Sequence, residues 1–362
     1  MKKITRKLVA LAAVAFPLLA ANQEPSLRHE ANRLGLLVGA AVEPAHFSEP
    51  EYASTLGREF NMIEPENAMK WTATEPARGR FDFAPGDKVV EFAEAHRMKV
   101  RGHNLLWGSY NPAWLSSRLT SSALREIMHQ HIARVAAHYA GRVFAWDVVN
   151  EAFDAQARLR HSLWYDQPGI GLAGQGTAYI EQAFRWAREA DRKALLFYND
   201  YDAEGLGPKS DAIYAMVKDF KRRGVPIDGV GLQMHVLKGA PPDPTSVDAN
   251  ITHLARLGVE VHITEMDVAL PTGAGGRVLD PAALGRQAEI YRNIAGVCAR
   301  NPGCTAFQTW GFTDKYSWIP YFTHFKMGGG LLFDADYRPK PSYDGVLKAF
   351  ETVKQPPARQ SR

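Results

Sequence analysis

The chain has 362 residues and a net charge of +4, with 43 lysine and arginine residues against 39 aspartate and glutamate residues. Four of the basic residues lie in residues 1–21, a segment without acids, so the rest of the chain carries no net charge. A chain without a basic stripe is not typical of proteins that bind nucleic acid, and a neutral polymer suits it better as a partner.

The first predicted element is a secretory signal at residues 1–21. Four basic residues precede an uncharged stretch, residues 8–21, that is too short to span a bilayer. We expect cleavage near Ala20 or Ala21. The mature protein is therefore expected to be secreted or periplasmic and not to lie in a membrane.

Apolar runs with the composition of strands recur at a nearly constant spacing along the rest of the chain. They are residues 36–42, 60–64, 99–104, 143–150, 194–199, 229–235, 259–264 and 305–311. Segments with helical periodicity lie between them, for example residues 87–96, 123–139, 179–190, 211–223 and 282–299. Eight strand–helix units predict an α/β fold, a (β/α)8 (TIM) barrel, as a single domain over residues 25–353. Residues 354–362 are expected to be a disordered tail.

Two of the apolar runs are followed directly by a glutamate, Glu151 after residues 143–150 and Glu265 after residues 259–264. Active-site residues of such barrels lie at the carboxyl ends of the strands, so the two carboxylates are expected to face one cleft. A pair of this kind can cleave a glycosidic bond, because one acid protonates the leaving oxygen and the other stabilises or captures the cationic sugar carbon. For either glutamate alone, a structural ion pair is the alternative.

The other predicted strands also end on polar or aromatic residues, which are candidates for binding a substrate. They are Glu66, Asn67, Lys70 and Trp71; His103, Asn104 and Trp107; Tyr198, Asn199 and Asp200; Gln233 and His235; and Trp310, Asp314 and Trp318. Tryptophans can stack on the apolar faces of pyranose rings, while amide, lysine and carboxylate groups can bind the hydroxyl rim. The alternative for a tryptophan is packing in the core, and the alternative for Lys70 is simple neutralisation of Glu66.

Three histidines near strand ends, His103, His235 and His262, raise the question of a metal site. They lack a matching set of carboxylates, so we expect neither a metal nor a cofactor. His262 lies three residues before Glu265, and the alternation of a strand then predicts that His262 faces the helices.

Cys298 and Cys304 are the only cysteines of the chain. In an exported protein such a close pair favours a disulfide that closes a short loop. Two buried thiols are the alternative, and two sulfurs without nearby histidines are not typical of a zinc site.

Eight motifs follow one another in an order that is typical of a known family. They are ENAMKW (residues 66–71), KVRGHNLLW (99–107), WDVVNEAFD (146–154), YNDYD (198–202), GVGLQMHV (229–236), ITEMD (263–267), WGFTDKYSW (310–318) and LLFDADYRPKPSY (331–343). With them the chain resembles the family 10 glycoside hydrolases, secreted endo-1,4-β-xylanases with a (β/α)8 barrel. The resemblance covers nearly the whole predicted mature chain.

The resemblance implies that Glu151 is the general acid/base, Glu265 the nucleophile and Asn150 the donor to the sugar 2-hydroxyl. It also implies that His235 hydrogen-bonds the nucleophile and that Asp267 orients His235. Further residues match positions that line the glycone subsites: Glu66, Asn67, Lys70, His103, Trp107, Gln233, Trp310 and Trp318. The cysteine pair matches the short disulfide of the family. The implied partners are xylan and xylo-oligosaccharides, bound by a monomer.

The chain departs from the family pattern at two places. Gly108, Ser109 and Tyr110 stand where the family usually has His-Ser-Gln, and Ile319 and Pro320 stand where a charged or polar residue is common. These changes bear on the preferences of individual subsites and not on the chemistry. The implied reaction is retaining hydrolysis, which requires carboxyl groups about 5–5.5 Å apart.

Other functions also fit parts of the pattern. The same chemistry could act on a β-glucan or a mannan, because clefts on this scaffold differ by few side chains. A glycan-binding protein without catalysis is a different class, but binding alone needs no paired acids. A metal-dependent barrel hydrolase is a third class.

Overall fold

The computed structural model describes residues 25–237, 241–273, 276–355 and 357–359. In this part of the chain eight parallel strands form a closed barrel: β1 (Leu37–Val42), β2 (Met62–Pro65), β3 (Lys99–Trp107), β4 (Ala145–Asn150), β5 (Leu195–Asp200), β6 (Gly229–Leu232), β8 (Glu260–Val268) and β10 (Cys304–Thr309). These strands pair in chain order, and β10 pairs with both β8 and β1, which closes the ring. The predicted (β/α)8 barrel is confirmed, whereas the predicted signal, residues 1–21, lies outside the described residues.

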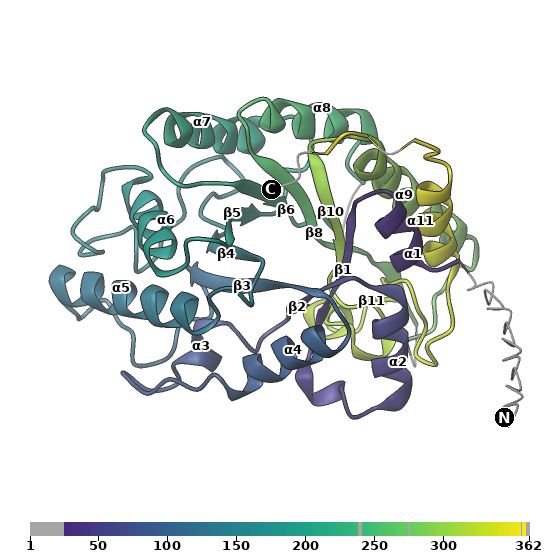
Figure 1. The fold of residues 1–362 in the computed structure, drawn as a ribbon, viewed down its shortest axis with the longest axis horizontal. Coiled ribbons are helices and arrows are strands. Elements are labelled where there is room, and N and C mark those ends of the chain that lie inside the picture. The colour runs from purple at the N-terminus through teal and green to yellow at the C-terminus, as the bar shows by residue number, and fades with distance from the viewer. Residues whose placement is uncertain (1–24, 238–240, 274–275, 356, 360–362) are drawn as a thin grey trace, which may run out of the picture.

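Helices surround the barrel, as Figure 1 shows. They are α1 (Leu27–Arg33), α2 (Pro50–Glu59), α3 (Trp71–Thr74), α4 (Ala84–Ala95), α5 (Ser121–His138), α6 (Ala178–Ala190), α7 (Pro208–Arg222), α8 (Pro244–Ala255), α9 (Ala282–Arg300), α10 (Ile319–Phe322) and α11 (Pro341–Glu351). The periodicity predicts α4, α5, α6, α7 and α9 within a few residues. Helices α2, α7, α8 and α11 each begin with a proline, which breaks a helix interior but suits its first turn. Among the described residues, none of these helices combines the length and apolarity needed to cross a bilayer.

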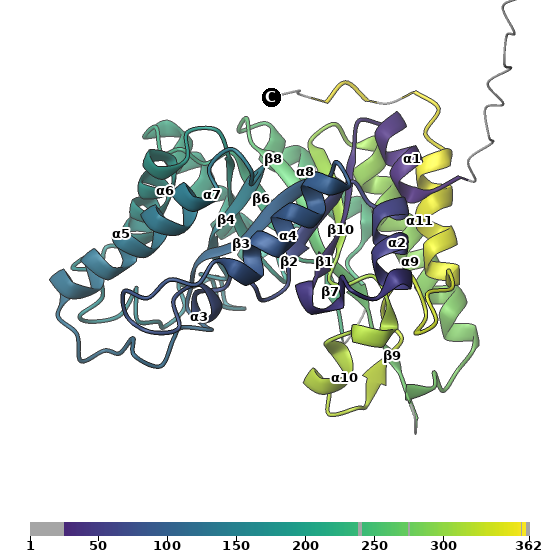
Figure 2. The ribbon, with the colours of Figure 1, turned by 60° about the horizontal axis from the view of Figure 1, so that its bottom comes forward.

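Shorter elements lie in the loops that follow the strands. They are η1 (Pro44–His46), β7 (His235–Val236), β9 (Leu270–Pro271), η3 (Asp314–Tyr316) and β11 (Met327–Gly328). Strand β7 pairs with the carboxyl end of β8 in parallel, and β9 pairs with β11 in an antiparallel ribbon. Figure 2 shows that α10 and β9 project beyond one end of the barrel. This is the carboxyl end of the strands, because the segment that contains α10 follows β10.

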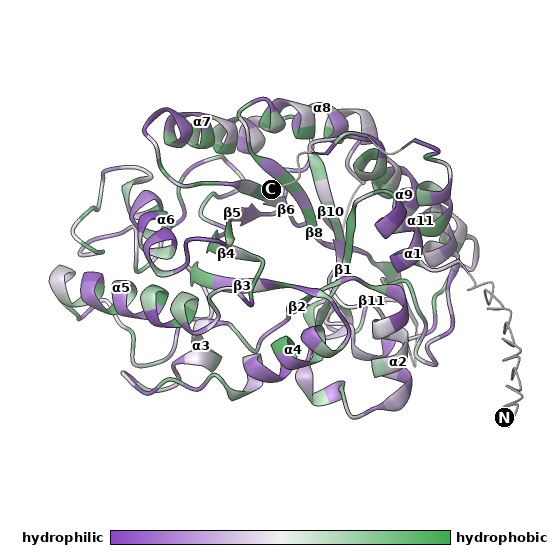
Figure 3. Ribbon diagram, in the orientation of Figure 1, coloured by the Kyte–Doolittle hydropathy of each residue, from purple (hydrophilic) through white to green (hydrophobic). Residues whose placement is uncertain are grey.

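The apolar residues form one core between the strands and the inner faces of the helices. Figure 3 shows this on α7 and α8, where hydrophobic residues lie on the side toward the strands and hydrophilic residues on the outer side. Trp146, Phe184 and Phe307 are fully buried members of this core. The burial removes apolar surface from water, which is the main force that holds the helices on the barrel.

A charged network fills the centre of the barrel. Arg101 on β3 donates from Nε to Asp147 Oδ2 at 3.2 Å and from a terminal nitrogen to His262 Nδ1 at 2.7 Å, and it lies 3.7 Å from Glu64. The four side chains are fully buried. They come from β2, β3, β4 and β8, so they can meet only inside the ring.

The prediction that His262 faces the helices is wrong. Strand β8 carries one extra residue relative to β10, because Phe307 pairs with Ile263 whereas Thr309, two residues later, pairs with Met266. Such a bulge shifts the alternation of side chains by one residue. His262 and Glu265 therefore both face the interior of the barrel.

Two features connect the end of the chain to the barrel. Cys298 at the end of α9 and Cys304 at the start of β10 form the predicted disulfide. The disordered tail predicted for residues 354–362 falls partly on residues outside the described ones. Among the described residues, Arg359 donates hydrogen bonds to the carbonyl oxygens of Leu34, Cys298, Ala299 and Cys304 at 2.9–3.0 Å. Arg359 therefore contacts the carbonyl ends of α1 and α9.

Candidate active site

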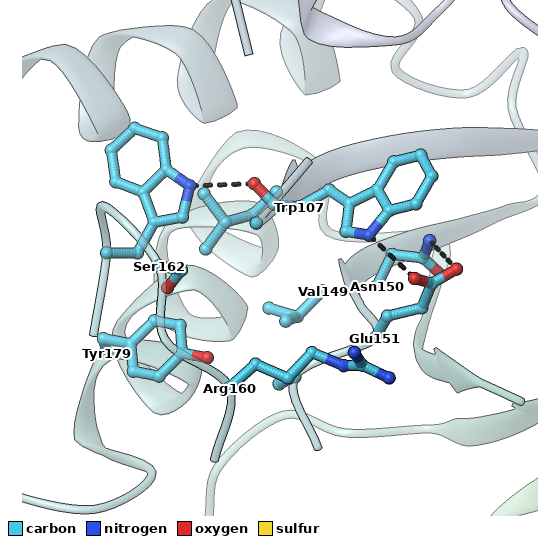
Figure 4. A pocket seen from close by; sticks show the side chains of 11 residues that line it. Trp107, Val149, Asn150, Glu151, Arg160, Ser162 and Tyr179 are labelled. Carbon is cyan, nitrogen blue, oxygen red and sulfur yellow. Dashed lines mark hydrogen bonds between the residues drawn. The ribbon is translucent and has the colours of Figure 1, made fainter. Parts of the chain in front are cut away.

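Glu151 follows β4 directly and turns the chain out of the barrel. Its backbone has a φ of +56°, a left-handed conformation that a residue other than glycine rarely adopts. Figure 4 shows its carboxylate between Trp107 and Asn150. Trp107 Nε1 donates to one carboxylate oxygen at 3.1 Å, and the other oxygen accepts from Gln233 Nε2 at 3.1 Å and Asn150 Nδ2 at 3.3 Å.

The surroundings of Glu151 favour its protonated form. Burial raises the pKa of Glu151, and the negative charges of Asp200 and Glu265 add to this effect. The hydrogen bond from Gln233 and the charge of Arg160 act in the opposite direction but do not cancel it. Glu151 is thus suited to act as a general acid.

Glu265 lies within β8 and is 4% exposed. Asn199 Nδ2 donates to one of its oxygens at 2.7 Å, and His235 Nε2 donates to the other at 3.0 Å. Burial alone would raise the pKa of Glu265, but the hydrogen bond and the positive charge of His235 outweigh it, so the pKa is lowered. Glu265 is therefore held as an anion.

His235 owes its charge to Asp267. Its Nδ1 donates to Asp267 at 3.0 Å, and Trp318 Nε1 donates to the second oxygen of the same carboxylate at 2.7 Å. Burial would lower the pKa of His235, but the two flanking carboxylates raise it well above its ordinary value. The three side chains therefore form a hydrogen-bonded row in which the His235 cation lies between the Asp267 and Glu265 anions.

Side-chain amides connect the two glutamates. Asn150 Oδ1 accepts from Asn199 Nδ2 at 2.9 Å and from Gln233 Nε2 at 3.3 Å. Asn199 also contacts Glu265, and Gln233 also contacts Glu151. The carboxyl ends of β4, β5, β6 and β8 therefore hold both acids in one network.

Both glutamates line a cleft of about 990 Å³ at the carboxyl ends of the strands. Most of the predicted site residues line it as well: Glu66, Lys70, His103, Trp107, Asn150, Gln233, His235, Trp310 and Trp318. A volume of this size is typical of ligand sites, and its aromatic walls and polar groups are those that a sugar needs.

One part of the cleft is rich in charge. Burial and the nearby Glu43 raise the pKa of Glu66 to about 7, although Lys70 opposes this. Lys70 Nζ lies 5.6 Å from the ring centres of both Trp107 and Trp310. A protonated Glu66 can donate a hydrogen bond as well as accept one, so this part of the cleft presents both kinds of group to a sugar hydroxyl.

Two residues predicted to bind substrate do not line the cleft. Tyr198 is fully buried, and its hydroxyl donates to Asp200 at 2.5 Å and accepts from the Ala152 N–H at 2.9 Å. Adjacent residues of a strand face opposite sides, and Asn199 already points to the centre, so Tyr198 must point away. Asn67 is exposed and lies outside the lining of the cleft, where it accepts from Lys70 at 2.9 Å.

The cleft also contains residues that the strand-end pattern does not single out. Tyr201 and Asp202 follow β5, and Glu43, His46 and Tyr316 come from loops near β1 and β10. The motif at residues 198–202 contains Tyr201, so the signal for this residue was present.

Arg160 reaches Glu151 from a loop after β4, as Figure 4 shows. Its Nε donates to the Phe153 carbonyl at 2.8 Å, and a terminal nitrogen donates to the Tyr201 hydroxyl at 2.5 Å. These two bonds fix a positive charge beside the acid, where it lowers the pKa of Glu151.

Among the described residues, one group of side chains has the ligand types for a metal ion. Glu64, His103 and Glu265 hold potential ligand atoms within 4.8 Å of one another. Arg101 lies 3.7 Å from Glu64 and already supplies a positive charge there. A divalent cation would face repulsion from this guanidinium, so the group is better suited to an ion-pair network.

The arrangement is suited to acid–base chemistry. Two carboxylates in one cleft have pKa values shifted in opposite directions, so one is protonated and the other ionised at the same pH. Aromatic walls and amides surround them. A glycosidic bond placed between them would meet a proton donor on one side and an anion on the other.

Comparisons with known proteins agree with this geometry. Residues 26–349 match the sequence model of "Glycosyl hydrolase family 10". The chain is 41% identical over 336 residues to "Endo-1,4-beta-xylanase B" of Thermotoga neapolitana, across 91% of this chain and 93% of that protein. It is 36% identical to "Endo-1,4-beta-xylanase A" of Phanerodontia chrysosporium, across 87% and 74% of the two chains. The structure is similar to that of xylanase 10B from Thermotoga petrophila in complex with xylobiose, with a TM-score of 0.84, 42% identity and coverage of 91% and 98%.

Proposed function

Because the chain belongs to glycosyl hydrolase family 10, we propose that it is an endo-1,4-β-xylanase in which Glu151 is the general acid/base and Glu265 the nucleophile. The protein is a glycoside hydrolase, and the proposal concerns its substrate and the roles of its residues. The observation that supports it most is the opposite pKa shift of two carboxylates joined by one amide network. The proposed substrates are xylan and xylo-oligosaccharides, because one relative is named an endo-1,4-β-xylanase and a similar structure is a complex with xylobiose.

In the first step, Glu151 donates its proton to the departing glycosidic oxygen while Glu265 attacks the anomeric carbon. The bond to the leaving sugar breaks, and a glycosyl ester forms on Glu265. The ester has no charge, so Glu151 no longer faces the negative charge of Glu265, which adds to the effect of burial in raising its pKa, and it ionises more readily. In the second step Glu151 takes a proton from water, which attacks the anomeric carbon and releases the sugar with retained configuration.

The supporting residues have separate roles in this reaction. His235 keeps the attacking oxygen of Glu265 ionised and oriented, and Asp267 keeps His235 protonated. Asn150 turns its amide from Glu151 to the 2-hydroxyl of the sugar when substrate is bound. Trp107, Trp310 and Trp318 form the aromatic walls of the cleft. The polar residues that bind the sugar hydroxyl groups are Glu66, Lys70, His103 and Gln233.

The first test is an assay of the purified protein on unsubstituted xylan, with mannan and carboxymethyl cellulose beside it. We expect internal cleavage of xylan to short oligomers and a β-anomer as the first product, seen by proton NMR. Glu265→Ala should be inactive on every substrate. The matched control is Glu260→Gln on the same strand, which is buried at the opposite end of the barrel and should keep wild-type activity.

The role of Glu151 is tested by the leaving group. Glu151→Ala should lose much more activity on xylan than on an aryl xylobioside with an activated leaving group, because only the former needs protonation. Equal losses on both substrates would remove Glu151 from the acid role. Activity of Glu265→Ala near that of wild type would remove Glu265 from the mechanism.

We also propose that the protein is exported as a monomer after loss of residues 1–21, with residues 25–353 as one catalytic domain. The composition of residues 1–21 supports export. Expression of the full chain in a secreting host, followed by N-terminal sequencing and sedimentation, would test both points. A cytoplasmic protein that keeps residues 1–21 would contradict the export.

A further inference from the structure

Three large aromatic side chains are exposed on one segment beside the cleft. Tyr321 is 76% exposed, Phe322 59% and Phe325 65%. The rings of Tyr321 and Phe325 lie 5.3 Å apart, and the ring of Phe322 lies 4.8 Å from that of Trp318. We call these three residues the aromatic ridge. Exposed apolar groups that lie together mark a surface that binds something more often than isolated ones do.

The segment is held in place, so the exposure of the ridge is built into the fold. The Phe325 N–H donates to the Pro320 carbonyl at 2.7 Å. The Thr323 hydroxyl donates to the Ile319 carbonyl at 2.7 Å and accepts from the Met327 N–H at 3.1 Å. The pairing of β11 with β9 then fixes the end of the segment.

The backbone beside Phe325 is strained. His324 and Phe325 have φ values of +51° and +58°, in the left-handed region that residues other than glycine rarely adopt. Two such residues in a row cost energy, and they persist because the surrounding bonds impose them. A loop that only connects two elements needs neither a strained backbone nor an exposed aromatic ring, so the combination suggests that this turn has a function.

The ridge continues one wall of the catalytic cleft. Tyr321 and Phe322 belong to the same cavity lining as Glu151 and Glu265, and Phe325 lies beyond that lining. Figure 2 shows the segment around α10 projecting past the end of the barrel. The ridge therefore continues the cleft wall from Trp318 outward into solvent.

We propose that the aromatic ridge binds a polysaccharide chain where the chain leaves the catalytic cleft, from Tyr321 and Phe322 on the cleft wall to Phe325 beyond it. It rests on the proposed function, and its occupant is the part of a xylan chain that leaves the cleft near Trp318. The apolar faces of successive pyranose rings stack on exposed aromatic rings, and the Tyr321 hydroxyl meets their hydroxyl groups. Continuity of the ridge with the cleft favours this occupant, because a polymer that spans the cleft must continue beyond its end.

The test separates a long substrate from a short one. Phe325→Leu removes the aromatic ring but keeps an apolar side chain and a residue other than glycine at the strained position. Phe325→Tyr keeps the ring. We expect Phe325→Leu to lower kcat/KM on soluble xylan about three- to tenfold, as loss of one aromatic stacking contact predicts. Its kcat/KM on an aryl xylobioside should stay within about twofold of wild type, and Phe325→Tyr should match wild type on both substrates.

A control and two contrary outcomes complete the experiment. Tyr214→Leu removes an aromatic ring from helix α7, away from the cleft, and should leave both activities unchanged. Wild-type activity of Phe325→Leu on xylan would overturn the ridge proposal while the proposed function stands. A wild-type dimer in sedimentation that Phe325→Asp dissociates would also overturn it, because a second copy would then cover the ridge. A wild-type protein inactive on both substrates would instead refute the proposed function.

Discussion

Replacement of Arg101 by methionine is expected to destabilise the barrel strongly, because Arg101 neutralises the buried carboxylate of Asp147. Arg101, Asp147 and Glu64 are fully buried. Burial alone would raise the pKa of Asp147, but the charges and hydrogen bonds of Arg101 and His103 together outweigh it and keep Asp147 ionised. Methionine has a similar length, so the substitution removes the charge and its hydrogen bonds while most of the packing stays.

The expected loss can be estimated from the burial of the pair. Removal of one partner from a buried ion pair costs about 3–5 kcal/mol, because the other charge stays buried without compensation. Unfolding of roughly 330 ordered residues has an entropy of about 0.7 kcal/mol/K at about 2.1 cal/mol/K per residue. A loss of about 4 kcal/mol therefore lowers Tm by about 6 °C.

The assay is calorimetric unfolding of Arg101→Met, with Arg286→Met as its matched control. Arg286 pairs with Asp280 on the surface, where the two side chains are 63% and 56% exposed, and its loss should not shift Tm measurably. The double variant Arg101→Met with Asp147→Asn should recover part of the loss, because the orphaned charge is then absent. Equal Tm values for the two single variants, or no recovery in the double variant, would refute the reasoning.

Three further predictions concern the site and the chain end. Arg160→Met removes a charge that lowers the pKa of Glu151, so this pKa rises and the alkaline limb of the kcat/KM–pH profile moves to higher pH; an unchanged or lower limb would contradict this sign. The double variant Cys298→Ala with Cys304→Ala should lower the free energy of unfolding in urea by about 2 kcal/mol, because the disulfide joins residues six positions apart and so restricts the unfolded chain. A urea midpoint equal to that of the wild type would refute this. Arg359→Ala should cost about 1 kcal/mol by the same method, since its donors satisfy four carbonyl oxygens, and no change would show that the tail is not attached in solution.

The position of the two acids could be predicted from sequence because it depends on local patterns. An apolar run predicts a strand, and the first polar residue after it lies at the carboxyl end of a barrel. This reasoning placed both glutamates in one cleft, although only Glu151 follows its strand, whereas Glu265 lies within β8, which continues to Val268. It placed Tyr198 wrongly, because a strand end offers two adjacent residues and only the register decides which one faces the centre.

Charge states could not be predicted from local patterns. The pKa of Glu151 is raised by burial and by Asp200, and the pKa of Glu265 is lowered by His235, which Asp267 keeps charged. These effects act over a few ångströms between strands that lie far apart in sequence. The sequence shows which ionisable side chains are present, but it does not show the distances between them in the fold.

The sequence by itself determined the barrel, the positions of its strands and the pair of glutamates, because strand periodicity and strand ends are local properties. Only the tertiary structure decided that a bulge in β8 turns His262 and Glu265 to the same side, that Arg101 neutralises the centre, and that Phe325 stands exposed on a strained turn. The first two depend on contacts between segments that are distant in the chain, whereas local hydrogen bonds and the pairing of β11 with β9 hold the turn of Phe325. Register and burial follow from the whole set of contacts, which no short stretch of sequence contains.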